Sequence, residues 1–312
     1  MKDLLDHLVS RRNEMNYTVC AVVVTYNRLL LLKECLKCIS SQLRSIDRLI
    51  IINNNSSDGT KKYLNCYKNN SRVHVINLDR NIGGAGGFSL GIQHAFEDTT
   101  CDYFWVMDDD TIPTKTALSE LISVIKKLHG NVGFLSSNIR WIDKSPAIMN
   151  IPEPDKKWNE RLKDRIIKIK SASFVSLLIN RNSVKKIGLP ISEFFIWGDD
   201  MEYTSRISQK YNCYLVDESI VIHKTVTNSE VNIIKETNLS RIPRYFFDIR
   251  NKGYIAKKRG IIHFWKYIIS SIFLILNILF NSKIYKIKKI IYIIRGVIAS
   301  FIFNPKVKFP NG

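Results

Sequence analysis

The chain has 312 residues, 45% of them hydrophobic, and a formal net charge of +19 at pH 7. The apolar content is ordinary for a globular protein, so a sizeable core can form in one large domain with an appendage, or in two small domains. The charge is concentrated in residues 249–312, which hold 13 Lys and Arg and no Asp or Glu. A uniformly basic surface would indicate nucleic-acid binding, whereas a basic segment rich in Ile, Phe and Tyr indicates an anionic membrane surface.

The sequence predicts an N-terminal extension at residues 1–17, before a domain at residues 18–260. Residues 1–16 are polar and charged and lack an apolar run of signal-peptide length. We therefore expect a cytoplasmic protein.

The first part of this domain alternates apolar runs with helical patterns. Four runs are rich in Val, Ile and aromatic residues, as in strands that are buried on both faces. The predicted strands cover residues 19–24, 48–52, 73–78 and 103–107. The predicted helices between them cover residues 30–42, 60–69 and about 88–97. This alternation predicts a parallel, doubly wound α/β sheet.

A polar segment follows each of these strands. The four segments cover residues 25–28, 53–59, 79–87 and 108–110. Ligands of such sheets bind beyond the carboxyl ends of the strands, so we expect the four segments to meet at one crevice. The glycines of the third segment suit close approach of the backbone to a phosphate, and the N-terminus of the following helix adds positive potential.

Three carboxylates, Asp108, Asp109 and Asp110, directly follow the fourth strand. Adjacent buried carboxylates repel each other unless a cation lies among them. In extended backbone Asp108 and Asp110 point to the same side, which favours a hard divalent ion such as Mg²⁺ or Mn²⁺. A solvated acidic turn is the alternative. With the glycine-rich segment nearby, a nucleotide diphosphate bridged to a metal is the better interpretation.

The second half of the domain is less regular. Further strands are predicted at 132–136, 173–179 and 214–222, a short helix ends near residue 188, and another helix covers about 201–210. Residues 141–170 are charged and contain three prolines, which predicts a loop or lid over the site. A second acidic cluster, Asp199, Asp200 and Glu202, opens the last helix, where it could serve only as a cap.

Five segments of the chain, in this order, resemble the family 2 glycosyltransferases of the GT-A fold. They are Val23-Val24-Thr25-Tyr26-Asn27-Arg28, the run Asn53 to Thr60, the run Asn81 to Phe88, the triple Asp, and the run Phe195 to Tyr203. Within that family the glycine-rich loop, the triple Asp, Asp-Asp-x-Glu and the following His-Lys most resemble bacterial galactofuranosyltransferases. Rhamnosyltransferases share much of the pattern.

The resemblance implies transfer of a sugar from a nucleotide-sugar donor with inversion at the anomeric carbon. It implies that Asp108, Asp110 and His223 hold Mn²⁺ or Mg²⁺ on the diphosphate. It also implies that Asp200 takes the proton from the acceptor hydroxyl. At the N-terminal edge of a helix, Asp200 is expected to stay ionised at neutral pH.

The resemblance assigns further residues to substrate binding. Thr25, Asn27 and Asn53 would lie at the nucleoside and Asp109 near the ribose or sugar, whereas Trp197, Asp199 and Glu202 would contact the acceptor or brace the helix. The remaining residues assigned to substrate binding are Arg28, Asp58, Asn81, Gly83 and Gly84. Two positions depart from the family: Asn53 stands where Asp is common, and Gly198 where Trp is common. These departures affect recognition of the base and stacking on the acceptor or sugar.

The expected reaction is metal-dependent transfer of galactofuranose from UDP-galactofuranose to a hydroxyl of a cell-surface glycan or lipid-linked acceptor. The nearest alternative is a rhamnosyltransferase that uses dTDP-rhamnose. A nucleotidyltransferase on a similar sheet, and a non-catalytic basic module that binds membrane or nucleic acid, are the other readings. The module would leave the acidic clusters without a role.

The tail, residues 261–312, has a different character. Residues 267–282 form an uncharged, mostly apolar run that is shorter than a membrane span of about 20 residues. Residues 284–303 are apolar with interspersed Lys and Arg. We expect basic amphipathic helices that lie on the inner surface of the cell membrane, so the protein would be peripheral. A transmembrane hairpin and a tail packed on protein are the alternatives.

Overall fold

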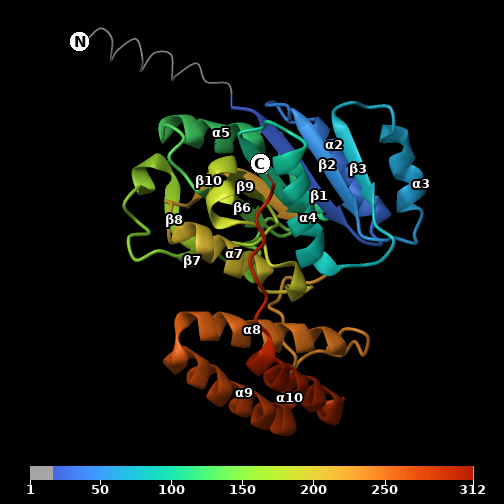
Figure 1. Ribbon diagram of the computed structural model, residues 1–312, viewed down its shortest axis with the longest axis vertical. Coiled ribbons are helices and arrows are strands. Elements are labelled where there is room, and N and C mark those ends of the chain that lie inside the picture. Colours follow the sequence, from blue (N-terminus) through green and yellow to red (C-terminus); the bar gives the residue numbers. More distant parts are fainter. Residues whose placement is uncertain (1–16, 312) are drawn as a thin grey trace.

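The computed structural model describes residues 17–311 (Figure 1). The predicted N-terminal extension therefore lies outside the described residues, except for Tyr17. The described chain forms an α/β body with a layer of three helices below it (Figure 1).

A single mixed sheet runs through the α/β body, in the order β3-β2-β1-β4-β9-β6-β10-β8-β7, with β5 paired to β10. The strands are β1 (Val19–Thr25), β2 (Arg48–Asn53), β3 (Val73–Asn77), β4 (Tyr103–Asp108), β5 (Thr111–Pro113), β6 (Phe134–Arg140), β7 (Glu153–Pro154), β8 (Ile166–Ser171), β9 (Leu177–Asn180) and β10 (Tyr214–His223). Strands β3, β2, β1 and β4 are mutually parallel, as predicted, and β6 is parallel to β10.

Helices cover both faces of the sheet. They are α2 (Leu29–Ser40), α3 (Thr60–Leu64), α4 (Gly83–Glu97), α5 (Ala117–Lys127), α6 (Arg181–Ile187) and α7 (Asp199–Ser208). Side chains of β1 alternate between two apolar cores: Val19, Ala21 and Val23 pack with α2 and α5, whereas the intervening residues pack with α4. This confirms the doubly wound α/β architecture.

Three predicted elements differ from the structure. The strand predicted at residues 173–179, for which no direction was predicted, begins only at Leu177 as β9, and it runs antiparallel between β4 and β6. The predicted loop at residues 141–170 is wrong at its end, where β8 alternates Ile and Lys and pairs antiparallel with β10. The predicted helix at residues 60–69 ends at Leu64 and continues as a short 3₁₀ turn, where three Asn residues disfavour a longer helix.

The lower layer consists of α8 (Tyr245–Arg259), α9 (Ile261–Asn281) and α10 (Lys286–Ile302). These helices share an apolar core that includes Tyr245, Ile249, Ile278 and Ile293. Because α8 belongs to this core, it joins the tail to the α/β body. The domain boundary predicted after residue 260 remains a prediction.

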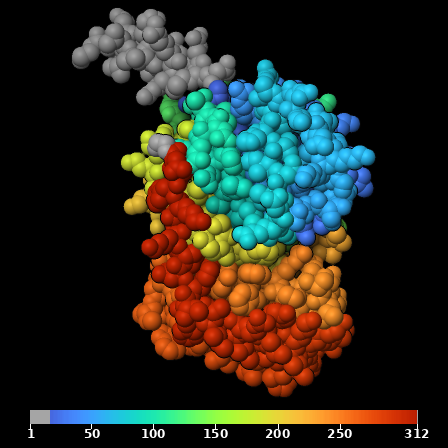
Figure 2. Space-filling view, turned by 45° about the vertical axis from the view of Figure 1, so that its right-hand side comes forward, coloured from blue at the N-terminus to red at the C-terminus, as the bar shows by residue number. Residues whose placement is uncertain are grey.

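The end of the chain returns from α10 along the α/β body (Figure 2, red). The backbone N–H of Leu189 donates to the carbonyl of Lys308 at 2.8 Å, and the N–H of Asn311 donates to Glu97 Oε1 at 2.8 Å. This C-terminal segment ties the helical layer to α4 and to the end of α6.

Helix α9 has 21 residues and a mean hydropathy of 1.7, so by length and composition it could cross a bilayer. The apolar run at 267–282 is therefore part of a longer helix, and the expectation that it is too short to span does not hold. The helix is longer because it begins at Ile261, before the uncharged run.

Candidate active site

The polar segments after β1, β2 and β4 contact one another. Thr25 Oγ1 donates to Asp109 Oδ2 at 2.7 Å, and Asn27 Oδ1 accepts from the N–H of Ser57 at 2.7 Å. Three of the four polar segments predicted to meet at the carboxyl ends of the parallel strands are thus in direct contact, whereas the crevice itself stays a prediction.

Strand pairing brings His223 to the triple Asp. Strand β4 ends at Asp108, the chain turns, and β5 pairs antiparallel with β10 so that Thr111 lies opposite His223. His223 Nε2 lies 3.2 Å from Asp110 Oδ1, and the N–H of Lys224 donates to the carbonyl of Asp110 at 2.9 Å. Both side chains are buried. A histidine at the end of β10 is therefore held at the acidic turn.

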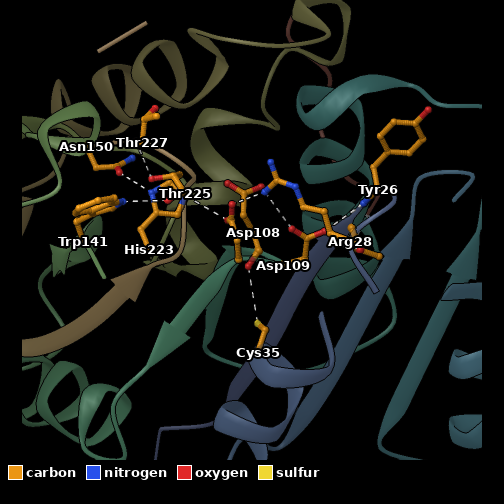
Figure 3. Close-up of polar contacts among 12 residues, drawn as sticks. Tyr26, Arg28, Cys35, Asp108, Asp109, Trp141, Asn150, His223, Thr225 and Thr227 are labelled. Carbon is orange, nitrogen blue, oxygen red and sulfur yellow. Dashed lines mark hydrogen bonds and ion pairs between the residues drawn. The ribbon is translucent and has the colours of Figure 1, made fainter. Parts of the chain in front are cut away.

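The other ring nitrogen of His223 is fixed by Asn150 (Figure 3). Nδ1 lies 2.7 Å from Asn150 Oδ1, and a carboxamide oxygen only accepts, so Nδ1 is the donor. Asn150 Nδ2 in turn donates to Ser173 Oγ at 3.0 Å. In the neutral ring this leaves a lone pair on Nε2, facing Asp110, which is the arrangement that metal-ligating histidines have.

Arg28 contributes a positive charge to this group. Its guanidinium donates to Asp110 Oδ2 and lies 3.5 Å from Asp109 Oδ1 (Figure 3). Burial and the neighbouring carboxylates raise the pKa of Asp108 well above its ordinary value. Burial raises the pKa of Asp109 to about 6, against the opposing effects of Arg28 and Thr25. The cluster thus favours a cation.

Asp110 differs from its two neighbours. Burial alone would raise the pKa of its carboxyl, but a hydrogen bond and charge from the His223 ring with Nε2 protonated, together with Arg28, lower it below the ordinary value; a metal ion would take the place of that Nε2 proton. Asp110 and His223 lie in contact, whereas among the described residues Asp108 is not gathered with them into a group of metal-ligand size, so the donor set of Asp108, Asp110 and His223 stays a prediction. Such a set fits a divalent ion like Mn²⁺, which accepts carboxylate oxygen as well as imidazole nitrogen.

Asn53, which was expected to lie at the nucleoside, forms hydrogen bonds within the protein. Asn53 is 1% exposed; its Nδ2 donates to Asn77 Oδ1 at 2.7 Å, and its Oδ1 accepts from the N–H of Ser56 at 3.1 Å. Asn53 therefore fixes the loop after β2. Its contact with the base stays a prediction.

The Asp58 side chain forms hydrogen bonds at the first residues of two helices, α2 and α3. Its carboxylate accepts from the N–H of Leu29, which opens α2, at 2.8 Å, and from Thr60 Oγ1 at 2.6 Å. Burial opposes ionisation of Asp58, but these hydrogen bonds outweigh it and lower the pKa of its carboxyl. The structure places Asp58 on the surface, where it supports the loops after β1 and β2.

The glycine-rich loop at the start of α4 requires glycine at one position. Gly83 has a φ of +78°, and a Cβ there would lie 2.0 Å from the carbonyl oxygen of Phe195. Asn81 Oδ1 accepts from the N–H of Gly83 at 2.8 Å, and Asn54 bonds to the backbone on both sides of the turn. A Cβ on Gly84, in contrast, would meet nothing within 4 Å.

The second acidic cluster lies against this loop, because the N–H of Ala85 donates to the carbonyl of Phe195 at 3.1 Å. Asp199 and Asp200 open α7, and burial outweighs the helix dipole that we expected to dominate. Burial, followed by Asp200, raises the pKa of Asp199 to about 8. Burial raises the pKa of Asp200 to about 6, against hydrogen bonds from backbone N–H groups that include that of Met201. As the pH rises, Asp200 therefore loses its proton at a lower pH than Asp199 does.

Two other residues that were predicted to lie at this cluster form contacts that stabilise it. Glu202 forms an ion pair with Arg206 at 2.7 Å, which opposes the rise that burial causes in the pKa of Glu202. Trp197 packs against Tyr245 of α8 with ring centroids 5.2 Å apart. Trp197 therefore links the cluster to the helical layer.

Residues 20–188, more than half of the chain, match the family described as Glycosyl transferase family 2. The chain belongs to this family of glycosyltransferases. The enzyme is 25% identical over 269 residues to the galactofuranosyltransferase GlfT1 of Mycolicibacterium smegmatis, which covers 78% of this chain and 84% of that protein. GlfT1 of Mycobacterium tuberculosis is 25% identical over 272 residues, 79% of this chain and 84% of that protein.

Solved structures show that this glycosyltransferase has the GT-A fold. A structure of GalNAc-T7 with UDP, GalNAc and Mn²⁺ superposes with a TM-score of 0.57 at 16% identity, over 75% of this chain and about half (48%) of that one. Residues 1–349 of S. aureus TarS in complex with UDP superpose with a TM-score of 0.52 at 14% identity, over 92% of this chain and 72% of that one.

Three asparagines that support the site of this glycosyltransferase were not predicted from the sequence. Asn54 lies in the segment Asn53 to Thr60 that resembles the family, so its position next to Asn53 could have indicated a role at the site. Asn150 and Asn251, which supports the second acidic cluster from α8, lie outside every motif. No pattern along the chain marks them, because their partners are distant in sequence.

Proposed function

We propose that this glycosyltransferase moves galactofuranose from UDP-galactofuranose to a hydroxyl of a cell-surface glycan or lipid-linked acceptor. The support for the sugar is the similarity to GlfT1, which spans both acidic clusters of the site. The support for the chemistry is that two carboxylate clusters with different surroundings lie close enough for the charge of Asp199 to act on Asp108. One suits a metal and a diphosphate, and the other suits a proton transfer.

On the donor side, Asp108, Asp110 and His223 would hold Mn²⁺ or Mg²⁺, with Asn150 fixing the imidazole. When bound, the ion neutralises the negative charge that develops on the leaving diphosphate. Arg28 adds a further positive charge at the same carboxylates. At the N-terminus of α4 the N–H of Gly84 would donate to a phosphate, because those of Gly83 and Ala85 already donate to Asn81 Oδ1 and to the carbonyl of Phe195.

On the acceptor side, Asp200 is the proposed general base. The acceptor oxygen forms a bond to the anomeric carbon while the bond from that carbon to the diphosphate oxygen breaks. The bonding electrons leave with UDP, and the hydroxyl proton passes to the carboxylate of Asp200. A pKa of about 6 leaves Asp200 mostly ionised at neutral pH yet basic enough to assist. Asp199, with a pKa of about 8, remains mostly protonated and can donate a hydrogen bond to the acceptor.

A panel of nucleotide sugars tests the donor. With Mn²⁺ and purified enzyme, we expect turnover of UDP-galactofuranose and release of UDP. Transfer from dTDP-rhamnose and from no other donor would show that the transferred sugar is rhamnose, and the reaction would still be glycosyl transfer. Release of pyrophosphate would indicate a nucleotidyltransferase, and no turnover of any donor would favour a non-catalytic module.

We also propose that the helical layer binds the inner surface of the cell membrane. Large apolar side chains are exposed along α9 and α10; they include Ile262, Trp265, Phe273, Phe280, Ile287, Ile298 and Ile302. Lys266, Lys286, Lys288 and Arg295 lie on the same helices. Exposed apolar area interspersed with basic residues is typical of a surface that inserts among anionic lipid headgroups. The enzyme would then be peripheral, on the cytoplasmic face, close to a lipid-linked acceptor.

A further inference from the structure

The turn that carries the second acidic cluster has an uncommon backbone conformation. Phe195, Trp197 and Gly198 have φ values of +66°, +64° and +86°. Bulky residues rarely adopt positive φ, so surrounding contacts must hold this turn in place. Helix α7 begins immediately after it, with Asp199 and Asp200.

Asn251 of α8 supplies such contacts. Its side chain is 1% exposed, and its Nδ2 donates to the carbonyls of Phe194 at 3.0 Å, Ile196 at 3.2 Å and Trp197 at 2.9 Å. Two N–H bonds are thus shared among three carbonyls of one turn. The carbonyl of Phe194 also accepts from the guanidinium of Arg250, which reaches the carbonyl of Glu193 as well.

The orientation of the Asn251 amide is fixed from its other side. Arg250 Nε and Nη2 donate to Asn251 Oδ1 at 3.1 and 2.9 Å. A guanidinium only donates and carbonyls only accept, so the oxygen must face Arg250 and the nitrogen must face the turn. The guanidinium lies 3.8 Å from the ring centroid of Phe303, directly after α10. The turn, α8 and the C-terminal segment are therefore linked through one amide.

We infer that Asn251 is a positioning residue for the transfer reaction, holding the turn at residues 194–198 so that Asp200 faces the acceptor. This inference rests on the proposed role of Asp200 as the base. The opposite side of the turn is held independently by Ala85, whose N–H donates to Phe195 O. Loss of the Asn251 contacts is therefore expected to displace Asp200 more than the glycine-rich loop.

Asn251→Asp tests the inference. Aspartate has the same shape and can still pair with Arg250, but it presents an acceptor to three carbonyls in place of two N–H donors. We expect kcat to fall by about ten- to a hundredfold, because small displacements of a catalytic group have such effects. The donor KM, and the affinity for UDP measured by calorimetry, should stay within about twofold.

Asn281→Asp is the matched control. Asn281 also lies in the helical layer, and its exposed Nδ2 donates only to Asn277 Oδ1, at 2.6 Å. It should leave kcat unchanged. Asn251→Ser is measured in parallel, because it keeps one hydroxyl donor without adding a charge and is expected to retain more activity than Asn251→Asp.

An unchanged kcat in both Asn251 variants would overturn the inference. A loss of kcat accompanied by an equal loss of UDP affinity would also overturn it, because that result describes general damage to the fold. Asp200→Asn separates the two proposals. If Asp200→Asn loses transfer while the Asn251 variants keep it, only the positioning role fails; if Asp200→Asn keeps transfer, the proposed base itself is wrong.

Discussion

Gly83 and Phe195 meet so closely that a Cβ on Gly83 would lie 2.0 Å from the Phe195 carbonyl oxygen. The loop proposed to bind the diphosphate is therefore packed directly on the turn that leads to Asp199 and Asp200. Because the two loops share this contact, a side chain at position 83 would push on the turn as well as on the loop.

Gly83→Ala and Gly84→Ala form a matched pair that tests this contact. The first adds a methyl group at φ +78° into a backbone carbonyl, and the second adds one into open space. We expect Gly83→Ala to lower the free energy of unfolding by about 1–3 kcal/mol and to weaken UDP binding. Gly84→Ala should leave the free energy of unfolding unchanged. Denaturant unfolding and calorimetry check both, and equal behaviour of the two variants would contradict the assigned packing.

Asn150 is predicted to set the metal affinity. Asn150→Leu removes the acceptor for His223 Nδ1–H, so the imidazole loses its fixed orientation. We expect Mn²⁺ binding in the presence of UDP to weaken by about 10- to 100-fold. Asp110→Ala or excess EDTA should abolish transfer, whereas Asp155→Ala, at a half-buried carboxylate that accepts from the N–H of Lys157, should behave as the wild type. Full activity in EDTA would remove the metal from the mechanism.

The predictable part of the site is the part that depends on strand order. Asn53 and Asp108 end β2 and β4, which both pair in parallel with β1, and the rule for parallel sheets was enough to place them at the same edge of the sheet. His223 was different: only the resemblance assigned it to the metal, because its pairing opposite Thr111 depends on the short β5, which no pattern predicts. Asn150 lies in the segment 141–170, which was predicted to be a loop. It contacts His223, a residue far from it in the sequence, and no sequence pattern indicates that contact.

Asp199 is predicted to make the stability depend on pH. Its pKa is raised to about 8 in the folded chain by burial and by Asp200, whereas an unfolded Asp has a pKa of about 3.9. Between these values the folded state binds more protons than the unfolded state, so stability falls as the pH rises. Asn cannot ionise, so Asp199→Asn should raise Tm relative to the wild type progressively from pH 5 to pH 8. A difference in Tm that does not change with pH would contradict the buried, protonated carboxyl. Asp155→Asn is the control.

Membrane binding is predicted to depend on exposed side chains of α9 and α10. Ile262, Phe280 and Ile302 are each about two-thirds exposed or more, so replacing all three by Ser should leave the helical core intact. We expect binding to anionic vesicles to weaken by at least about tenfold, because each apolar side chain contributes to insertion. Val226→Ser is the control, since Val226 is equally exposed on the α/β body. Vesicle binding that survives the triple substitution would favour a tail that packs on protein.

Asp200 is predicted to control the acid limb of the pH–rate profile. A general base must be ionised, and burial raises the pKa of Asp200 to about 6, so kcat/KM should rise with pH through about 6. Asp200→Asn keeps the shape of the side chain but removes the basic oxygen. It should lower transfer by about 10²–10⁴-fold and abolish this limb, while UDP affinity stays near that of the wild type. Asp199→Asn should keep the limb, because Asp199 is protonated over that range. If the limb persists in Asp200→Asn and disappears in Asp199→Asn, then Asp199 is the base.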